Sequence, residues 1–499
     1  MTSMGRIRDV GRKRPTARPR GWLGALRVLS VVAAMLLIAA ACGDDDDAAD
    51  APAEPEQTAA PAAPDEPEPA ATEPAAEEEV MAEPETLKIG LMTGLSGGFA
   101  PWGTQFHDSL NLWAEMVNDG RLSQWSSVVS PDGGISVGGA EYVVEIVPYD
   151  TMNDVATAVA GAQKLVLRDN VSVIIGPVGE TEAMVASNDV INDNGVLNLQ
   201  LSTLWQSQGE QWPLSINILT DMQDYYQAVY QWMVDEHPEI ERVAIITTDQ
   251  PYGRIGALVA HKYAAETGAF EIVHESYVPF DTVDYSAVVT AALAEDPDII
   301  DIGGAASPDA FTGILTNAFQ QGFEGTPPAD GGPAVKFMAT SWNPDLVLAN
   351  VTEDYFEGVV QGYPTASWGP DGPTEEAAWL YNAMIDRYGA DQAAAWNTVT
   401  PGGYYAGRVL LEGIAAAGSV DPTSVAEALV GMEVVNTPMG PAGWTGLTLS
   451  GVDHSLVFPE RVLQRQNAGW AIVAEIEAPF PWNYDWEGLP GADQFQPNP

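Results

Sequence analysis

From Leu87 onward, short runs of aliphatic residues alternate with longer stretches in which apolar residues recur every three or four positions. Runs such as Val171–Gly176 are almost continuously apolar, as is typical of strands that are covered on both faces. We interpret nine runs as strands: Leu87–Thr93, Tyr142–Pro148, Val171–Gly176, Val196–Leu201, Val243–Thr248, Ile272–Val278, Ile299–Gly303, Lys336–Thr340 and Gly358–Gly362.

The intervening stretches have the period of amphipathic helices. They are Thr104–Asn118, Asp154–Arg168, Glu182–Asn194, Asp224–Glu236, Tyr252–Thr267, Asp284–Ala294, Pro308–Gln321 and Glu375–Tyr388, and Gly403–Ala417 and Pro422–Val430 follow them. Strand and helix alternation predicts an α/β fold with parallel sheets. A chain of 499 residues is too long for one core, and the break near Thr220-Asp221 favours two doubly wound parallel-sheet lobes with a cleft between them. We expect the Pro- and Trp-rich tail after Glu477 to lie on the surface.

The chain begins with an arginine-rich segment and the apolar run Val28–Ala41, interrupted only by Ser30. This run is too short to span a bilayer comfortably, so residues 1–41 are expected to be a signal peptide. Cys42, the only cysteine, follows three alanines and resembles a bacterial lipobox, although Ala39 stands where that pattern prefers leucine. The sequence predicts lipidation at Cys42 and a membrane anchor; a soluble secreted protein with an incidental cysteine is the alternative.

Residues 42–85 consist mainly of Ala, Pro, Asp and Glu, which predicts a disordered acidic tether. The whole chain has a net charge of −50, and eight of its 20 Lys and Arg residues lie before Val28. Binding of nucleic acid through its phosphates is therefore excluded as a function. We interpret the acidity as a property of a well-solvated surface.

Ligands of open parallel sheets bind at the carboxyl ends of the strands. The loops at those ends are therefore the candidate site. They are Gly94–Gly103, Asp150–Asn153, Gly176–Thr181, Gln200–Trp205, Asp249–Tyr252, Gly303–Pro308 and Ser341–Pro344.

Several of these segments carry a family resemblance. They are Leu87–Leu91, Leu95–Ala100 with Trp102-Gly103, Ile174–Pro177, Arg242–Ile246 with Tyr252-Gly253, Asp284–Val289 and Met439–Pro441 with Trp444. In this order they resemble type I periplasmic solute-binding proteins of the branched-chain amino-acid, or leucine-binding, class. The resemblance extends from Leu87 to Ile476.

The resemblance implies two lobes joined by three crossovers, which close like a hinge on a small solute and present it to an ABC permease. Lobe one is expected at 86–220 and 364–436, lobe two at 221–363 and 437–480, and a C-terminal tail at 481–499. The implied function is that of a lipid-anchored extracytoplasmic binding protein of an ABC importer. A nutrient sensor of the same fold is the alternative.

The resemblance also implies ligand contacts. Trp102 and Tyr252 align with aromatic residues of the family's site, and Gly179 and Thr181 lie where a helix N-terminus would bind a carboxylate. Ser202, Thr203, Ser341 and Trp342 complete the candidate set. Ordinary structural roles compete with each assignment: core packing for the aromatic residues, and helix capping or turn formation for the hydroxyl residues.

Two departures from the family concern the ligand's amino group. The family's ammonium-binding acid is absent from the aligned turn Ser341-Trp342-Asn343, and Ala305-Ala306 replace an aromatic residue. A buried ammonium without a partner charge is costly. Either another acid, such as Asp221 or Glu180, supplies the charge, or the ligand is an amide, urea-like compound or carboxylic acid held by Trp102 and Trp342.

Catalytic patterns are weak. Gly94–Gly98 matches G-x-S-x-G, but a nucleophile elbow needs its helix to start at once, and Gly98–Gly103 intervene. The five histidines are isolated, and the chain has neither metal-ligand spacing nor G-x-x-x-x-G-K. We therefore expect neither enzymatic activity nor a metal or other cofactor, and a secreted hydrolase using Ser96 is the remaining alternative.

Overall fold

The computed structural model describes residues 83–279, 282–304, 308–329, 331–340, 342–362, 369–370, 372–393, 399–477 and 483–498. The chain divides into two units, Met1–Glu79 and Val80–Pro499, and every described residue belongs to the second. The predicted signal peptide, Cys42, almost all of the predicted tether and Ser341 lie outside the described residues. Among the helices that are described, none is both long enough and apolar enough to cross a membrane.

Lobe one is built on a nine-stranded sheet with the order β12-β13-β14-β6-β5-β4-β1-β3-β2. Its central strands are parallel, and its two edges are antiparallel. The strands are β1 (Glu85–Thr93), β2 (Ile135–Val137), β3 (Ala140–Asp150), β4 (Val173–Val178), β5 (Leu197–Leu201), β6 (Ser215–Asn217), β12 (Val435–Thr437), β13 (Gly440–Thr445) and β14 (Ser455–Val457).

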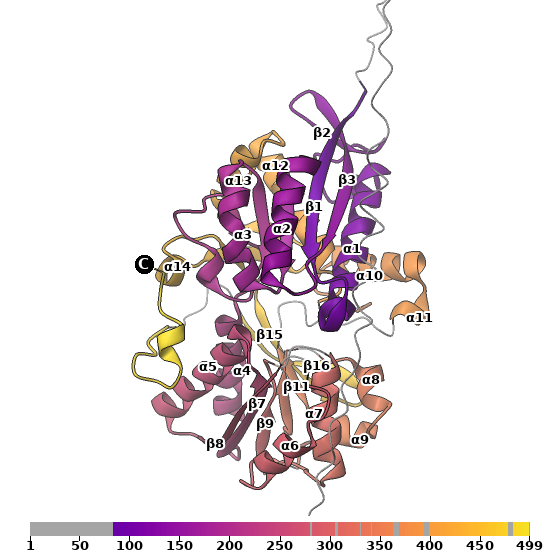
Figure 1. Cartoon of the computed structure of the whole chain (residues 1–499). Coiled ribbons are helices and arrows are strands. Elements are labelled where there is room, and N and C mark those ends of the chain that lie inside the picture. The colour runs from indigo at the N-terminus through magenta and orange to yellow at the C-terminus, as the bar shows by residue number, and fades with distance from the viewer. Residues whose placement is uncertain are drawn as a thin grey trace, which may run out of the picture. The chain divides into compact units, whose positions relative to one another are not determined.

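Helices cover both faces of this sheet (Figure 1). Val173 and Ile175 pack with the core of α1, α10, α12 and α13, whereas Ile174 packs with α2 and α3 on the other face. This alternation explains why β4 is apolar at every position. The helices are α1 (Ala100–Asn118), α2 (Val155–Lys164), α3 (Thr181–Asp193), α10 (Glu375–Tyr388), α12 (Gly402–Ala417) and α13 (Pro422–Val430).

Lobe two is built on a seven-stranded sheet with the order β16-β15-β11-β10-β9-β7-β8. Helices α4 and α5 pack on one face, and α6 to α9 pack on the other. The strands are β7 (Arg242–Thr248), β8 (Glu271–Val278), β9 (Ile299–Asp301), β10 (Phe337–Ala339), β11 (Val360–Gly362), β15 (Glu460–Gln466) and β16 (Gly469–Ile476). The helices are α4 (Met222–Glu236), α5 (Pro251–Thr267), α6 (Ser286–Leu293), α7 (Pro308–Gln320), α8 (Pro344–Leu348) and α9 (Glu353–Phe356).

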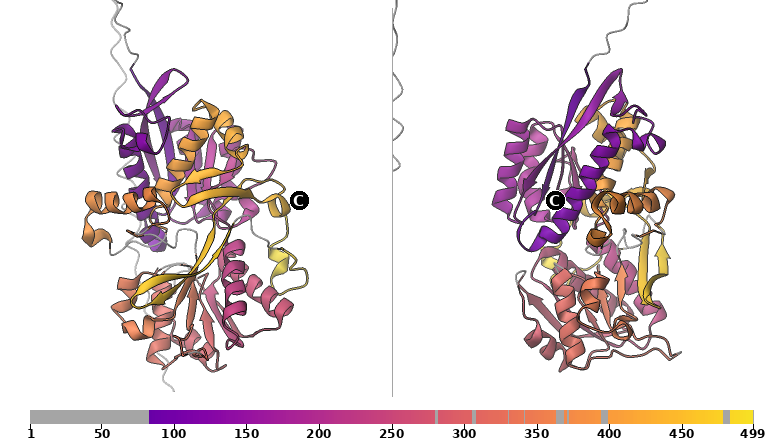
Figure 2. Two further views of the ribbon diagram at one scale, coloured as in Figure 1. Left: turned by 180° about the vertical axis from the view of Figure 1, so that it is seen from behind. Right: turned by 90° about the vertical axis from the view of Figure 1, so that its right-hand side faces the viewer.

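The chain passes between the lobes three times: from β6 to α4, from β11 to α10 and from β14 to β15. The predicted fold class, two doubly wound α/β lobes joined by three crossovers, is thus confirmed. The antiparallel β15–β16 pair that follows the last crossover is the long yellow hairpin in Figure 2.

One predicted lobe boundary is wrong. Residues 437–480 were assigned to lobe two, but β13 and β14 belong to the sheet of lobe one, where Ser455 pairs with Asn217 of β6. Only the segment from Glu460 onward joins the second sheet. Short antiparallel strands do not encode in their own sequence which sheet they extend, so the boundary depends on pairing across the fold.

The C-terminal segment 483–498 is packed rather than draped on the surface as expected. Trp486 is 3% exposed and stacks on Trp205 of lobe one, with 5.8 Å between ring centroids. The Tyr484 hydroxyl donates to Asp224 Oδ1 of α4 in lobe two at 2.7 Å. The segment therefore contacts both lobes. Its aromatic residues provide the apolar area that is buried in these contacts, and the many prolines in the sequence did not indicate this packing.

Three carboxyl groups are buried around the crossovers. Asp221, Asp224 and Glu460 are each only 1% exposed. Burial raises the pKa of Asp224 to about 7, although the Tyr484 hydroxyl opposes this shift. Burial also raises the pKa values of Asp221 and Glu460 well above the ordinary range, and the charge of Asp224 contributes to both shifts. Folding therefore binds protons at this cluster.

These shifts predict a pH dependence of stability. The folded-state pKa of Asp224 lies above its ordinary value of 3.8, so the stability linked to this group is present below about pH 4 and is lost as pH rises through about 7. Replacing Asp224 with Asn should flatten the decline of the unfolding free energy between about pH 4 and pH 7 by up to about 1.4 kcal/mol per pH unit. Urea unfolding at several pH values measures this slope.

The control for this measurement is Asp132→Asn, because Asp132 is exposed. That variant should keep the slope of the unmodified protein. Parallel pH profiles for Asp224→Asn and the unmodified protein would show that this carboxyl group ionises alike in the folded and unfolded states.

Candidate functional site

An apolar pocket is formed where the carboxyl ends of strands from both sheets come together, as expected for open parallel sheets. We call it the apolar chamber; its volume is about 730 Å³ when the open solvent at its mouth is included. Its lining comes from both lobes and comprises Phe99, Trp102, Phe106, Asn153, Val178, Gly179, Leu201, Thr203, Leu219, Met222, Tyr252, Gly303, Thr340 and Val399.

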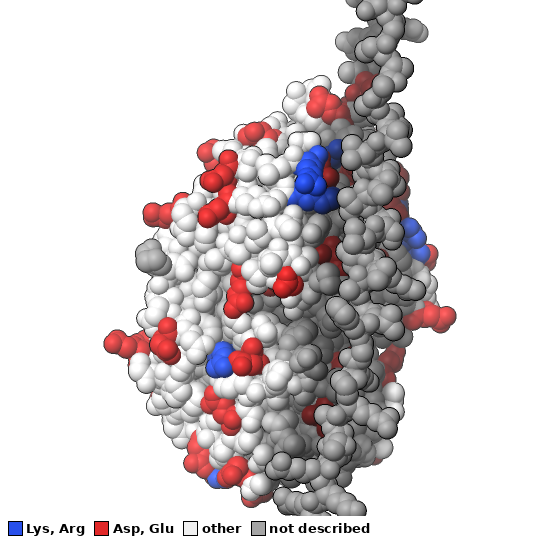
Figure 3. All heavy atoms as spheres, in the orientation of Figure 1, with Lys and Arg blue, Asp and Glu red and all other residues white. Residues whose placement is uncertain are grey.

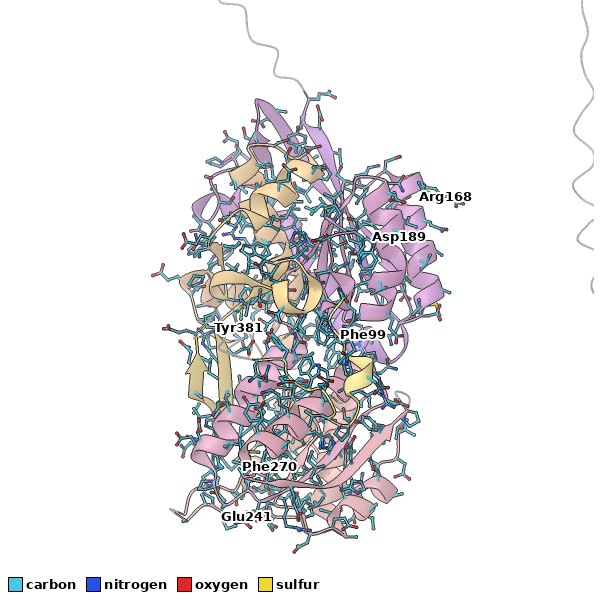
Figure 4. All side chains as sticks on the ribbon, turned by 90° about the vertical axis from the view of Figure 1, so that its left-hand side faces the viewer. Phe99, Arg168, Asp189, Glu241, Phe270 and Tyr381 are labelled. Atoms are coloured by element: carbon cyan, nitrogen blue, oxygen red, sulfur yellow. The ribbon has the colours of Figure 1, made fainter. Side chains whose placement is uncertain are left out.

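Aromatic residues at the start of α1 form one wall of the chamber. Phe99, which lies at the junction of the lobes in Figure 4, meets Trp102 edge to face, with 5.4 Å between centroids and an interplanar angle of 86°. Trp102 packs against core clusters of both lobes. Its Nε1 is buried without a hydrogen-bond partner among the described residues. The wall thus offers an apolar surface to the chamber.

A second, polar pocket adjoins the chamber and shares Asn153, Gly179, Thr203 and Tyr252 with it. We call it the polar vestibule. Its remaining lining residues are Val155, Glu180, Thr181, Glu182, Ala183, Gln250 and Pro251. A molecule with an apolar body and a polar end could therefore occupy both spaces.

The vestibule lies against the N-terminus of α3. The first intrahelical bond here runs from the Met184 amide to the Glu180 carbonyl at 3.0 Å. The amides of Thr181, Glu182 and Ala183 therefore lack partners within the helix, as the first turn of any α-helix must. Such amides, together with the helix dipole, favour a carboxylate or another anionic oxygen.

Hydroxyl groups support this helix end. Thr181 Oγ1 lies 3.1 Å from both Ser202 Oγ and Thr203 Oγ1. Ser202 is fully buried, and its hydroxyl donates to the Leu204 carbonyl at 2.7 Å. Thr181 and Thr203 line the vestibule, whereas Ser202 holds Thr181 from behind.

Lobe two contributes Tyr252 from the first turn of α5. Burial raises the pKa of Tyr252, although Thr248 opposes this shift, so the phenol is neutral at physiological pH. The start of α5 touches the exit of β9 through glycines: a Cβ on Gly304 would lie 2.3 Å from Gly253 Cα. This close approach sets Tyr252 beside Gly303 at the chamber.

Glu180 is the acidic group nearest the helix end in the vestibule. It occupies the N-cap position of α3, and its Oε1 accepts a hydrogen bond from Thr151 Oγ1 at 2.7 Å. Burial raises the pKa of Glu180 to about 7; the Thr151 hydroxyl opposes this, and the negative charges of Asp150 and Asp154 reinforce it.

The lining of the chamber and vestibule contains no Lys, Arg or His among the described residues. The nearest base that lines an adjoining groove, Arg254, pairs with Asp249 at 2.5 Å. Acidic side chains also predominate over basic ones on the face seen in Figure 3.

The structure brings together most of the candidate residues named from sequence. Trp102, Gly179, Thr203 and Tyr252 line the chamber, and Thr181 lines the vestibule. Ser202 lies behind this surface, and Ser341 lies outside the described residues.

Trp342 is not brought to the pocket. It is 2% exposed within the lobe-two core, beside Phe311, Phe337 and Phe356. Its Nε1 donates to the Val360 carbonyl at 3.0 Å. The indole is thus committed to packing and to a structural hydrogen bond.

The structure also places Asp221, the other candidate partner for an ammonium group, and Ser96, the candidate nucleophile. Asp221 is buried at the crossover, where Asn217 Nδ2 donates to its Oδ1 at 3.1 Å, and it does not line either pocket. The Ser96 hydroxyl is hydrogen bonded to Asp150. Among the described residues, no histidine is hydrogen bonded to Ser96, as a nucleophile would require.

Sequence reasoning missed several lining residues. Asn153 lies in a loop that was already marked as a candidate, Thr340 immediately precedes the candidate loop Ser341–Pro344, and Phe99 immediately precedes the helix that carries Trp102. Leu219, Met222 and Val399 come from segments at the crossovers and before α12. Their apolar side chains carry no signal that would separate them from core residues.

Two doubly wound lobes with a ligand-sized pocket between their strand ends define a two-lobed binding protein. A family model described as periplasmic binding protein matches residues 86–468, and the chain belongs to this family. The resemblance to type I periplasmic binding proteins of the branched-chain amino-acid class is confirmed.

Curated relatives are binding proteins. A leucine-, isoleucine-, valine-, threonine- and alanine-binding protein from Pseudomonas aeruginosa is 25% identical over 363 residues, covering 72% of this chain and 86% of the relative. A Leu/Ile/Val-binding protein homolog from Brucella abortus is 24% identical over 341 residues, covering 68% and 81%.

Solved structures share the fold. A solute-binding protein of an ABC transporter from R. palustris, in complex with 4-hydroxybenzoate, has a TM-score of 0.61 at 20% identity and covers 79% of this chain and 96% of its own. A leucine-binding protein from Thermotoga maritima has a TM-score of 0.60 at 19% identity, covering 79% and 99%.

Proposed function

We propose that this protein is an extracytoplasmic solute-binding protein of an ABC importer. The observation that carries the proposal is the pocket itself: an apolar chamber with lining from both lobes, joined to a vestibule at a free helix N-terminus. Such a site binds a small molecule and offers no hydrolytic constellation among the residues described around Ser96. Membership of the periplasmic binding protein family supports the proposal.

The ligand is an amino acid, amide or carboxylate with an apolar body. The polar end would accept hydrogen bonds from the first-turn amides of α3 and from Thr181, while the body lies against Phe99 and Trp102. Amino acids and carboxylates are both represented among the proteins compared, since one relative binds leucine, isoleucine and valine and a solved structure holds 4-hydroxybenzoate.

Binding would act through closure of the hinge. Trp102 of lobe one and Tyr252 of lobe two line the same chamber, so a ligand that contacts both is held best when the lobes approach. A ligand shifts the lobes toward the closed form only by as much as it prefers that form. The closed form is what an ABC permease would recognise.

Retention at the membrane would keep the protein close to its permease. We propose that a diacylglycerol and an N-acyl chain on Cys42 provide this anchor, and that residues 43–85 act as a spacer. The Cys42→Ser variant should then be released into the medium, whereas a protein that is not lipidated would be released with or without this substitution. Loss of solute uptake on deletion of the gene distinguishes an importer component from a sensor.

Isothermal titration calorimetry tests the proposed binding. The panel consists of leucine, isoleucine, valine, phenylalanine, benzoate, 4-hydroxybenzoate and short amides, with mass spectrometry of whatever copurifies with the protein. We expect one of these classes to bind with a dissociation constant in the micromolar range or below. A folded protein that binds no member of the panel and carries no copurified solute would overturn the proposal.

A further inference from the structure

A ligand with an ammonium group would need a partner charge in the site, and the sequence left Asp221 and Glu180 as candidates for it. The structure separates them. Asp221 is 1% exposed, accepts a hydrogen bond from Asn217 and does not line either pocket. Glu180 lines the vestibule directly beside Thr181, where the ligand's polar end would lie.

One carboxylate oxygen of Glu180 accepts a hydrogen bond within the protein, and the other has no partner among the described residues. Oε1 accepts from the hydroxyl of Thr151, a fully buried residue, and this bond fixes the direction of the side chain. Oε2 has no hydrogen-bond partner among the described residues, and it is not one of the enclosed atoms of the fold. It is therefore available to a ligand that enters the vestibule.

The surroundings of Glu180 favour a cation. The negative charges of Asp150 at the end of β3 and of Asp154 at the N-cap of α2 raise its pKa, and Glu182 lies in the first turn of α3. Lobe two faces the vestibule with Gln250, Pro251 and the neutral Tyr252. None of the described lining residues is basic, so a ligand ammonium would be the only positive charge within the vestibule.

We propose that Glu180 pairs with a cationic nitrogen of the ligand and thereby selects zwitterionic amino acids with apolar side chains over simple carboxylates. The inference rests on the proposed function and assigns this selection to a residue of lobe one. The ligand's carboxylate would accept hydrogen bonds from the first-turn amides of α3, and its ammonium would form an ion pair with Glu180 Oε2. Its side chain would lie in the chamber beside Trp102.

Proton exchange accompanies this pairing. An empty site whose carboxyl pKa is about 7 is partly protonated at neutral pH. A neighbouring ammonium favours the ionised form, so binding of an amino acid releases a fraction of a proton. A ligand with only a carboxylate favours the protonated form, so its binding takes up a fraction of a proton.

Two matched ligand pairs test the proposal on the full-length protein: leucine with 4-methylpentanoate, and phenylalanine with 3-phenylpropanoate. The members of each pair differ only in the amino group. For the pair that binds, we expect the amino acid to bind at least about 30-fold more tightly. Calorimetry in two buffers of different ionisation enthalpy should show proton release for the amino acid.

The Glu180→Gln variant should reduce the preference for the amino acid to within about threefold and abolish proton release. The control is Asp193→Asn, which removes a charge from the exposed far end of the same helix and should leave both unchanged. Unaltered selectivity in Glu180→Gln, or tighter binding of the des-amino ligand by the unmodified protein, would overturn the inference while leaving a binding protein. Failure of every ligand to bind would instead count against the proposed function.

Discussion

Replacing Trp102 with Ala is expected to weaken ligand binding by about 100-fold. Large aromatic residues at the centre of a binding site typically contribute 2 kcal/mol or more, and each 1.4 kcal/mol corresponds to a factor of about ten. Trp102 occupies such a position, because its ring lines the chamber and packs against the cores of both lobes. Its removal takes away ligand contact and also contact between the lobes.

Calorimetric titration of the ligand identified from the panel measures this loss. The matched variant is Trp102→Phe, which keeps an apolar ring beside Phe99 and should retain affinity to within about tenfold. Thermal unfolding of both variants shows whether they are folded. If folded Trp102→Ala bound as tightly as the unmodified protein, the chamber would not be the ligand site.

Replacing Arg408 with Met is expected to destabilise the protein by about 3–5 kcal/mol. Arg408 is 3% exposed, and its Nε donates to Glu376 Oε1 at 2.6 Å. Glu376 also accepts the Tyr404 hydroxyl at 2.7 Å and is 5% exposed. Removing the guanidinium leaves this carboxylate buried beside α12 without its positive partner.

Urea unfolding compares this variant with two others. Arg121→Met breaks an exposed ion pair with Asp119 and should cost less than about 1 kcal/mol. The double variant Arg408→Met with Glu376→Leu leaves no buried carboxylate at position 376 and should recover part of the lost stability, although Glu412 still lacks its ion pair with Arg408 and the Tyr404 hydroxyl loses its acceptor. Equal losses for Arg408→Met and Arg121→Met would show that the buried pair contributes no more than a surface pair.

The alternation of apolar runs and helical periods was sufficient to predict both lobes. The continuous apolar run Val173-Ile174-Ile175 indicates a strand with two covered faces. Such a local pattern can be recognised without knowing how the rest of the chain packs. The rule that loops after parallel strands form the site predicted the loops that contain Trp102, Thr181 and Tyr252, and the family resemblance singled out Trp102 and Tyr252 within them.

Features that depend on distant partners were not predictable. Trp342 also follows a strand, yet its ring enters the core because Phe311, Phe337 and Phe356 surround it there. The lobe membership of β13 and β14 is set by pairing with β6, and the packing of Trp486 is set by Trp205. In each case the deciding residue lies far along the chain, where a local pattern cannot report on it.

Small-angle X-ray scattering with and without a saturating ligand tests most directly whether the two lobes shut on a solute. Closure predicts that the radius of gyration and the maximum dimension both fall as ligand is added, with a midpoint that matches the calorimetric affinity. A scattering profile that stays unchanged while calorimetry shows the site to be filled would contradict the account.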